Sequence, residues 1–328
     1  MTKIWYEADA TLDAVADEAV ALIGYGNQGR SWALNLRDSG LDPIVCVRRD
    51  ETRELAAAEG FQVEDLGDAS GAGIVCVLVP DDVIPSLPYA PSATTCTIVA
   101  SGYTLAFDRF GPAGDIGMVA PRMLGPEVRS CFEAGAGFIT AVTVHRDVSG
   151  RARERVLAIA KAIGGLREGA IELTAGQEAI LDLGVEQVLS PALTAVSNAF
   201  VATMLAHDIP LDAIITELVL SGEVERTYRL MRESGFAVQS EFHSPTSQYG
   251  QLSRRGRYDH LDLQSTMRAL TDDIASGRFA DEWDAERDAG YPRLQQLKEQ
   301  HAGPMVREFE ADLRRRLGPN VSTTPAGS

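Results

Sequence analysis

A glycine-rich turn near the N-terminus constrains this chain more than any other feature. The apolar run Ala21-Leu-Ile leads into Gly24-Tyr-Gly-Asn-Gln-Gly29, and residues 30–39 then follow a helical pattern. In that context Gly24 permits a tight turn, Gly26 lets the backbone approach a pyrophosphate, and Gly29 allows close packing of helix on strand. The helix N-terminus would present unpaired N–H groups and partial positive charge to the phosphates. We therefore predict a dinucleotide-binding site formed by Gly24, Tyr25, Gly26, Asn27, Gln28 and Gly29.

Short apolar runs alternate with helical stretches through the first half of the chain. This alternation is typical of a parallel sheet with crossover helices. We expect strands at residues 19–23, 43–47, 73–79, 95–100, 117–120 and 138–145, and a helix at 149–163. Beyond residue 174 we expect only helices, at 178–189, 193–207, 214–234 and 263–276. The sequence thus predicts an α/β fold: a Rossmann-type parallel-sheet domain at 1–174, an all-α domain at 175–317 and a disordered tail at 318–328.

The acidic balance of the chain argues against partners that carry many phosphates. Its 30 Lys and Arg face 47 Asp and Glu, which gives a formal charge of −17, whereas a nucleic-acid or anionic-membrane face should be basic. Residues 1–9 lack a signal-peptide pattern. The four cysteines have neither zinc nor disulfide spacing; they are Cys46, Cys76, Cys96 and Cys131. We expect a cytoplasmic protein with a small-molecule substrate and neither nucleic-acid nor membrane partners.

The longest apolar run, residues 188–206, has the length of a membrane span. It is interrupted by Ser190, Pro191, Thr194 and Asn198 and begins beside Glu186. These polar interruptions favour a buried helix in a soluble core.

The residues after the second expected strand bear on cofactor choice. An NAD site places an acid there for the ribose 2′-hydroxyl, whereas an NADP site places basic groups for the 2′-phosphate. Here the sequence is Arg48-Arg49-Asp50-Glu51-Thr52-Arg53. Arg48, Arg49, Thr52 and Arg53 could cradle a phosphate, because guanidinium pairs with phosphate bidentately. The alternative is a solvated loop whose arginines pair with Asp50 and Glu51. We favour NADPH, and Asp50 leaves NADH open.

Several motifs, in order along the chain, resemble the ketol-acid reductoisomerases. The glycine turn and the following Ala33-Leu-Asn-Leu-Arg-Asp-Ser-Gly40 are similar to the first turn and helix of that family. Further matches are Leu78-Val-Pro-Asp-Asp82, Met118-Val-Ala-Pro121, Asp182-Leu-Gly-Val-Glu-Gln187, Ser244-Pro-Thr-Ser-Gln-Tyr-Gly250 and Ser276-Gly-Arg-Phe-Ala-Asp-Glu-Trp283. The resemblance implies an NADPH- and magnesium-dependent enzyme of branched-chain amino-acid synthesis. It also implies a knotted helical domain that dimerises, with higher assembly left open.

The resemblance assigns further residues to the cofactor and the metal. Arg49 and Thr52 fall on the family's phosphate-contacting positions, and the cofactor edge would include Val79, Pro80, Asp81, Ser101 and Gly102. Asp182 and Glu186 match its metal motif. They are four residues apart, so a helix would place both carboxylates on one face, and such oxygen ligands suit Mg²⁺. Taken alone, a pair like this is more often a solvated helix face; the apolar neighbours and the resemblance favour the metal.

The chain departs from the family pattern at the residues that would rearrange the substrate. The family's second metal-binding pair, a Glu-x-x-x-Glu from the partner chain, becomes Glu217 with Ser221, or Val219 with Glu223, depending on the alignment. Neither register keeps both acids, so Glu217 and Glu223 are weak ligand candidates. A family histidine becomes Ser101, and a catalytic lysine becomes Arg122. A guanidinium keeps its proton in proteins, whereas lysine can be tuned to exchange one.

The family reaction has two steps, and these departures affect only the first. Alkyl migration needs two metal ions, whereas hydride transfer mainly needs orientation and charge stabilisation. We therefore predict an NADPH-dependent reductase of a C=O or C=N bond in a keto acid or imine, with the isomerase step weakened or lost. Asp182 and Glu186 would hold a metal or a substrate ammonium, and Ser101, Arg122, Glu217 and Ser244 would line the pocket. The alternatives are an authentic ketol-acid reductoisomerase that converts 2-acetolactate to 2,3-dihydroxy-3-methylbutanoate, and a non-catalytic NADP-binding protein.

Overall fold

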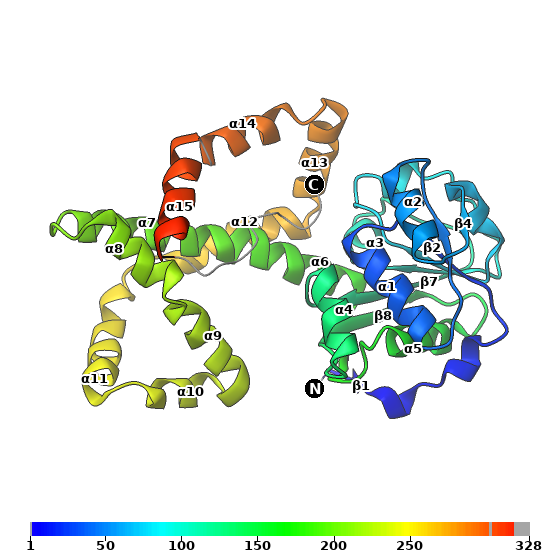
Figure 1. Ribbon diagram of the computed structural model, residues 1–328, viewed down its shortest axis with the longest axis horizontal. Coiled ribbons are helices and arrows are strands. Elements are labelled where there is room, and N and C mark those ends of the chain that lie inside the picture. The colour runs from blue at the N-terminus through cyan, green and yellow to red at the C-terminus, as the bar shows by residue number, and fades with distance from the viewer. Residues whose placement is uncertain (1, 302–303, 318–328) are drawn as a thin grey trace. The chain divides into compact units, whose positions relative to one another are not determined.

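The computed structural model describes residues 2–301 and 304–317, which form two compact units (Figure 1). The first unit runs to Asp182 and the second begins at Leu183. The domain boundaries that we predicted, 1–174 and 175–317, stay a prediction. The predicted tail at 318–328 lies outside the described residues.

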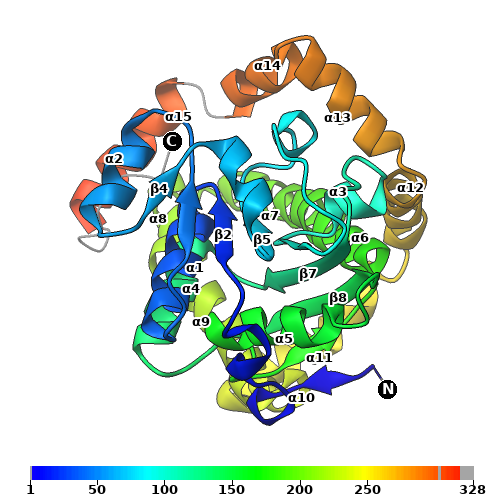
Figure 2. The same cartoon turned by 90° about the vertical axis from the view of Figure 1, so that its right-hand side faces the viewer.

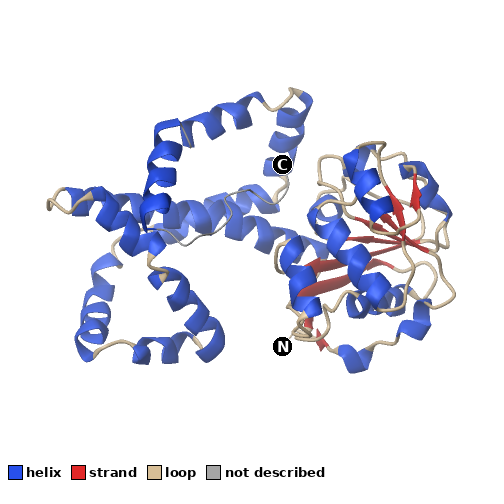
Figure 3. Cartoon of the chain, in the orientation of Figure 1, coloured by secondary structure: helices blue, strands red, loops and turns tan. Residues whose placement is uncertain are grey.

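Nine strands of the described chain form one mixed sheet in the first unit, in the order β1-β9-β8-β7-β6-β5-β2-β3-β4 (Figure 3). The strands are β1 (Ile4–Trp5), β2 (Val20–Ile23), β3 (Ile44–Cys46), β4 (Val63–Glu64), β5 (Ile74–Val77), β6 (Cys96–Val99), β7 (Asp115–Pro121), β8 (Thr140–Arg146) and β9 (Ala170–Glu172). The six neighbouring strands β7, β6, β5, β2, β3 and β4 are parallel to one another, and β8 runs antiparallel to β7. The chain order changes direction at β2, which has β3 on one side and β5 on the other. Ligands of such sheets bind at the carboxyl ends of the strands beside this point.

Helices cover the sheet because both of its faces are apolar. Leu22 and Ile23 are adjacent in β2 and fully buried, yet they belong to different core clusters, as expected when both faces of a parallel sheet are covered. The α-helices of this unit are α1 (Asn27–Asp38), α2 (Glu51–Ala58), α3 (Tyr103–Ala106), α4 (Gly125–Glu133), α5 (Ala152–Ala162) and most of α6 (Ala175–Gly184), which continues into the second unit. Helix α1 contacts both α4 and α5 (Figure 2). The predicted Rossmann-type unit is thus confirmed.

The glycine turn after β2 is closed by backbone contact. Gly24 has φ of +103°, a conformation that L side chains rarely adopt. A Cβ placed on Gly29 would lie 2.2 Å from the carbonyl oxygen of Gly24. Helix α1 therefore starts directly against the end of the strand, as the spacing predicted.

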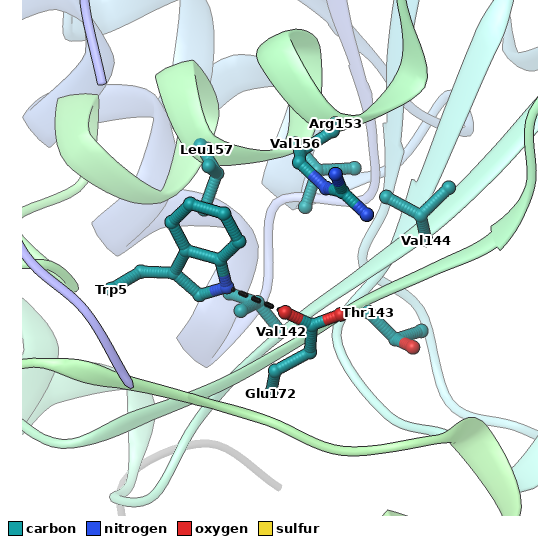
Figure 4. A pocket seen from close by; sticks show the side chains of 8 residues that line it. All are labelled: Trp5, Val142, Thr143, Val144, Arg153, Val156, Leu157 and Glu172. Carbon is teal, nitrogen blue, oxygen red and sulfur yellow. Dashed lines mark hydrogen bonds between the residues drawn. The ribbon is translucent and has the colours of Figure 1, made fainter. Parts of the chain in front are cut away.

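Strand β1 adds an antiparallel edge that the sequence pattern did not predict. It pairs with β9, and the indole Nε1 of Trp5 donates a hydrogen bond of 2.9 Å to Glu172 Oε2 (Figure 4). The ammonium of Lys3 lies 3.4 Å from the Trp5 ring centroid. The gap beside Trp5 measures about 10 Å³, which is room for no more than one water. It is a packing gap and not a ligand site.

The described part of the second unit is entirely helical, as predicted. Its helices are α7 (Ser190–Leu205), α8 (Leu211–Ile215), α9 (Glu223–Ser234), α10 (Phe236–Gln239), α11 (Pro245–Arg254), α12 (Leu263–Ala275), α13 (Arg278–Asp288), α14 (Pro292–His301) and α15 (Pro304–Leu317). The single helix predicted at 214–234 is wrong. The chain breaks at Gly222, whose φ of +71° is left-handed, so α8 with the π-helical turn Thr216–Leu220 is separate from α9.

Helix α7 is apolar but not buried. The continuous helix from Ala175 to Leu205 is long and apolar enough to cross a membrane by length and composition alone, which by itself is weak evidence for a span. Only 6% of its most apolar window is buried, and no residue of α7 is buried. The burial that we expected for this run is therefore not supplied by the chain itself.

Candidate active site

A cleft of about 410 Å³ opens where the glycine turn leaves β2. Gly24 and Gly26 line it from the turn, Val79 and Pro80 from the end of β5, and Thr52 from α2. This is the switch point of the sheet, and the N-terminus of α1 follows the turn. The arrangement fits a dinucleotide whose pyrophosphate lies against the turn.

Asp50 organises the hydrogen bonds at one edge of this cleft. It precedes α2 and accepts hydrogen bonds from the backbone N–H of Thr52 at 3.1 Å and from the Thr52 hydroxyl. The Thr52 hydroxyl, followed by the backbone N–H, holds the pKa of Asp50 below its usual range. Arg48 Nε lies 3.5 Å from Asp50 Oδ2. Arg48, Asp50 and Thr52 all line the cleft.

Asp65 holds the other two arginines that we predicted as phosphate ligands. Arg49 Nη2 and Arg53 Nη1 each lie 2.8 Å from one of its carboxylate oxygens. The Arg49 side chain is nevertheless 81% exposed. The alternative was that the arginines of this loop pair with acids of the same loop. Arg48 does so with Asp50, whereas Arg49 and Arg53 pair with Asp65 instead. Asp65 directly follows β4, a short strand that the sequence pattern did not predict.

The loop after β7 packs directly on the glycine turn. Gln28 Nε2 donates to the carbonyl oxygen of Met123 at 3.1 Å, and its own Oε1 accepts from Trp32 Nε1. A Cβ on Gly125 would lie 2.3 Å from the carbonyl carbon and oxygen of Asn27. The glycine turn and the loop after β7 are therefore packed together. A second cavity of about 450 Å³ opens beside them.

Arg122 bridges two carboxylates in that second cavity. Its Nη1 donates to Glu178 Oε1 at 2.6 Å and its Nη2 to Asp182 Oδ1 at 2.7 Å. The other oxygen of Glu178 accepts the backbone N–H of Gly102 at 2.7 Å. We call Arg122, Glu178 and Asp182 the Arg122 cluster. Ser101, Gln28 and Glu127 also line the cavity.

The Arg122 cluster is positioned by regular structure. Arg122 directly follows β7, and its backbone N–H donates to the carbonyl of Ile139 at 2.9 Å. Glu178 and Asp182 lie one turn apart on α6 and so share a face. Burial raises the pKa of Glu178, and the nearby Asp182 carboxylate adds to the rise, while the N–H of Gly102 and Arg122 oppose it. The Glu178 side chain is 2% exposed, against 26% for Arg122 and 42% for Asp182.

The cluster does not fit a magnesium site. Among the residues that the structure describes, no group of three His, Cys, Asp or Glu side chains is placed to hold a metal ion. Mg²⁺ requires near-octahedral oxygen ligands, but Asp182 faces a guanidinium. Glu186 follows one turn later within the π-helical segment Val185–Leu189. Metal binding by Asp182 and Glu186 therefore stays a prediction that this geometry does not support.

The other predicted site residues lie in the second unit. Glu217 is exposed in the π-helical turn Thr216–Leu220, and Glu223 pairs with Arg226 at 2.6 Å. Ser244 caps α11, where its hydroxyl accepts the backbone N–H of Ser247 at 3.3 Å. Their assignment to the substrate pocket or the metal stays a prediction.

Comparison with known proteins covers both units. Residues 14–169 match the model of the acetohydroxy acid isomeroreductase NADPH-binding domain, and residues 176–318 that of the ketol-acid reductoisomerase C-terminal domain. The chain is 33% identical over 329 residues to the ketol-acid reductoisomerase (NADP(+)) of Methanocaldococcus jannaschii, with 97% of this chain and 99% of that protein covered. It is 34% identical over 326 residues to putative ketol-acid reductoisomerase 3 of Saccharolobus solfataricus, covering 96% and 98%.

A solved structure agrees with the sequence relatives. The NADH-preferring ketol-acid reductoisomerase from an uncultured archean superposes with a TM-score of 0.87 at 27% identity, over 95% of this chain and 98% of that one. The resemblance noted in the motifs is thus confirmed, together with a Rossmann-type domain followed by a helical domain; the knot and the dimer that it also implied stay predictions. With its NADPH-binding domain and this ancestry, the chain is an NAD(P)H-dependent oxidoreductase and belongs to the ketol-acid reductoisomerase family.

Proposed function

We propose that this chain is an NADPH-dependent reductase that transfers hydride to the C=O or C=N bond of a small substrate, with the isomerase step weakened or lost. The observation that carries the proposal is the engagement of Arg122 by Glu178 and Asp182. Arg122 stands where the family resemblance implies a catalytic lysine, and a guanidinium keeps its proton. A rearrangement that exchanges a proton at this position would have no group to do it.

The residues of the two cavities support a hydride transfer. NADPH, bound in the cleft beside the glycine turn, supplies the hydride. Arg122 and Ser101 line the adjoining cavity, where a guanidinium and a hydroxyl can orient a polar double bond. The contact between Gly125 and Asn27 fixes the cavity against the cofactor turn. These groups bind and orient, which is what a reduction chiefly requires of the protein.

The test separates the two steps of the family reaction. NADPH oxidation is followed with 2-acetolactate and, separately, with 3-hydroxy-3-methyl-2-ketobutyrate, each with Mg²⁺ and with EDTA. We expect 2-acetolactate to be inert while the already rearranged keto acid or a cyclic imine is reduced. Mg²⁺-dependent turnover of 2-acetolactate would instead establish an authentic ketol-acid reductoisomerase. NADPH binding without reduction of any keto acid or imine would establish the non-catalytic alternative.

We further propose that the reductase is a cytoplasmic homodimer that buries α7 between its copies. Leu193, Val196 and Phe200 are exposed on this helix, and burying them would remove apolar surface from water. Light scattering after gel filtration should give twice the chain mass. Val196→Asp with Phe200→Asp should shift the protein to monomer, whereas Val148→Asp, at an exposed site in the first unit, should not. An unchanged mass in the double variant would place the interface elsewhere.

A further inference from the structure

We propose that Arg122 takes the place of a divalent cation in the second cavity, so that reduction needs no metal and the preferred substrate is an iminium ion. This inference rests on the proposed reductase function and specifies the substrate of the same site. It goes beyond the family membership, because Arg122 is a departure of this chain from the family pattern. Two observations carry it, the geometry of the Arg122 cluster and the charge of the cavity, together with the fact that a guanidinium keeps its proton in proteins.

The geometry fixes a positive charge where a metal would need free carboxylate oxygens. Both terminal nitrogens of Arg122 are within 2.7 Å of carboxylate oxygens, one from Glu178 and one from Asp182. A metal ion bound to either oxygen would lie beside a guanidinium that cannot give up its charge. Mg²⁺ binding therefore requires Arg122 to leave two short charge-assisted hydrogen bonds.

The cluster has little freedom to rearrange. Glu178 is also held by the backbone N–H of Gly102, and a Cβ on Gly102 would lie 2.4 Å from the carbonyl oxygen of Ala175. Arg122 is held at its backbone by Ile139. Removing Arg122 from the nearly fully buried Glu178 would leave a buried carboxylate without its partner, which is strongly unfavourable.

The charge of the cavity selects the substrate. Among the described residues that line the cavity, Arg122 is the single basic side chain, against the acids Glu127, Glu178 and Asp182. The formal sum is negative, and it stays negative if one carboxylate carries a proton. Without a metal to neutralise these acids, the anion of a keto acid is repelled, whereas a cationic substrate is attracted.

The balance of the reaction points the same way. Hydride from NADPH forms a new C–H bond at the iminium carbon, and the π electron pair of C=N becomes the lone pair of the amine nitrogen. The products are a neutral amine and NADP⁺, and no proton has to be delivered. Reduction of a ketone leaves an alkoxide that needs a proton, and Arg122 cannot donate one. An iminium substrate thus suits a cavity whose resident cation is not an acid.

A binding measurement tests the metal part without relying on activity. Free Mn²⁺ is followed by its electron paramagnetic resonance signal during titration into the NADPH-loaded protein, with Mn²⁺ as the probe for Mg²⁺. We expect no saturable binding to the wild type and a new site in Arg122→Gln, which leaves Glu178 and Asp182 without their cation. Arg129→Gln is the matched control, because Arg129 also bridges two carboxylates, Asp38 and Glu133, elsewhere. Stoichiometric Mn²⁺ binding by the wild type would overturn the inference.

A kinetic measurement tests the substrate part. N-methyl-3,4-dihydroisoquinolinium, a permanent cation, is compared with 3-hydroxy-3-methyl-2-ketobutyrate, in EDTA and in Mg²⁺. We expect kcat/KM to favour the iminium by about tenfold or more, because the net negative charge of the cavity attracts the cation and repels the keto-acid anion, and we expect EDTA to change nothing. Preference for the keto acid, or loss of iminium reduction in EDTA, would overturn the inference while leaving the reductase function standing. Absence of turnover with both substrates, and with all the keto acids and imines tested above, would refute the reductase function, and the Mn²⁺ titration would still decide the role of Arg122.

Discussion

Asp50 accepts two hydrogen bonds from Thr52, one from its backbone N–H and one from its hydroxyl, at the edge of the cofactor cleft. This carboxylate is the kind of group that binds a ribose 2′-hydroxyl in NAD sites, whereas the neighbouring Arg48 is the kind that binds a 2′-phosphate. The cleft therefore carries determinants of both cofactors. The chain belongs to a family with an NADPH-binding domain, and one solved relative in that family is NADH-preferring.

Asp50→Asn should shift the preference further towards NADPH. The change removes a negative charge that opposes the 2′-phosphate and weakens the hold on the Thr52 hydroxyl. We expect the ratio of KM for NADH to KM for NADPH to rise by about fivefold to tenfold. Glu51→Gln, one residue further on, is the control for a general change of charge. An unchanged ratio in Asp50→Asn would show that this carboxylate does not face the ribose.

Asp65→Asn should strengthen NADPH binding by a different route. Asp65 engages both Arg49 and Arg53, so its neutralisation frees the Arg49 guanidinium for the phosphate and leaves Arg53 held only by backbone carbonyls such as that of Glu64. Titration of NADPH by protein fluorescence should show tighter binding with a steeper salt dependence, and NADH binding should not change. Because the Asp65 carboxylate is about half exposed, the melting temperature should change little. Equal gains for the two cofactors would argue against contact with the 2′-phosphate.

Gly125→Ala should weaken cofactor binding without touching the cofactor. A Cβ at this position meets the backbone of Asn27 at 2.3 Å, so the glycine turn or the start of α4 has to move. We expect the Kd for NADPH to rise by about tenfold or more, in line with the sensitivity of sites to small displacements. Gly176→Ala, where a Cβ meets nothing within 4 Å, should leave the Kd unchanged. Similar behaviour of the two variants would mean that the contact is relieved elsewhere.

Asp115→Asn should destabilise the first unit by about 3–5 kcal/mol, the usual cost of breaking a buried ion pair. The Asp115 carboxylate is fully buried. It accepts hydrogen bonds from the backbone N–H of Val148 and Ser149, the Ser149 hydroxyl and Arg155 Nη1. Urea unfolding at neutral pH, followed by circular dichroism, measures the loss. Ser130→Ala, at an exposed hydroxyl that bonds only locally, is the control.

The stability that Asp115 supplies should also depend on pH. Burial works to raise its pKa, but the hydrogen bonds from Ser149, Val148 and Arg155 outweigh it and hold the pKa below the usual range. Because the pKa is depressed in the folded state, the carboxylate stabilises the fold fully at pH values above the pKa of the unfolded state, which is near 3.9. This contribution disappears as the pH falls through the lower pKa of the folded state. The difference in unfolding free energy between wild type and Asp115→Asn should therefore be constant from pH 7 to about 5 and shrink below about 4.

Residue spacing and apolar runs predicted those parts of the fold that depend on short stretches of sequence. The glycine turn, the central strands and the helical second unit follow from residue spacing and apolar runs. The strands β1, β4 and β9 were missed because each has only two or three residues and, unlike the equally short β3, lies outside a longer apolar run. The helix break at Gly222 was missed because the sequence does not show whether a glycine inside a helical pattern adopts a positive φ.

Pairing across the sequence was harder to predict than the site itself. Arg122 and Asp182 were identified from the sequence as parts of one pocket, and the structure brings them together. Glu178 was missed, although its position one helical turn before Asp182 was a usable signal. Asp65 offered no such signal, because it meets Arg49 and Arg53 only through the pairing of β3 with β4. For α7, the apolar composition predicted a buried helix, but no residue of α7 is buried in the structure.

The closed space around Gly102 gives this charge arrangement a recognisable signature. A side chain at 102 would collide with Ala175 and with the Glu178 carboxylate, so this arrangement of the buried acid requires a glycine at 102. A genome search for relatives with the same electrostatics therefore need not rely on overall similarity. It can require an arginine directly after the proline that ends β7, a glutamate four residues before the aspartate of α6, and a glycine before α3. Sequences that keep all three would form a natural group in which to look for shared substrates.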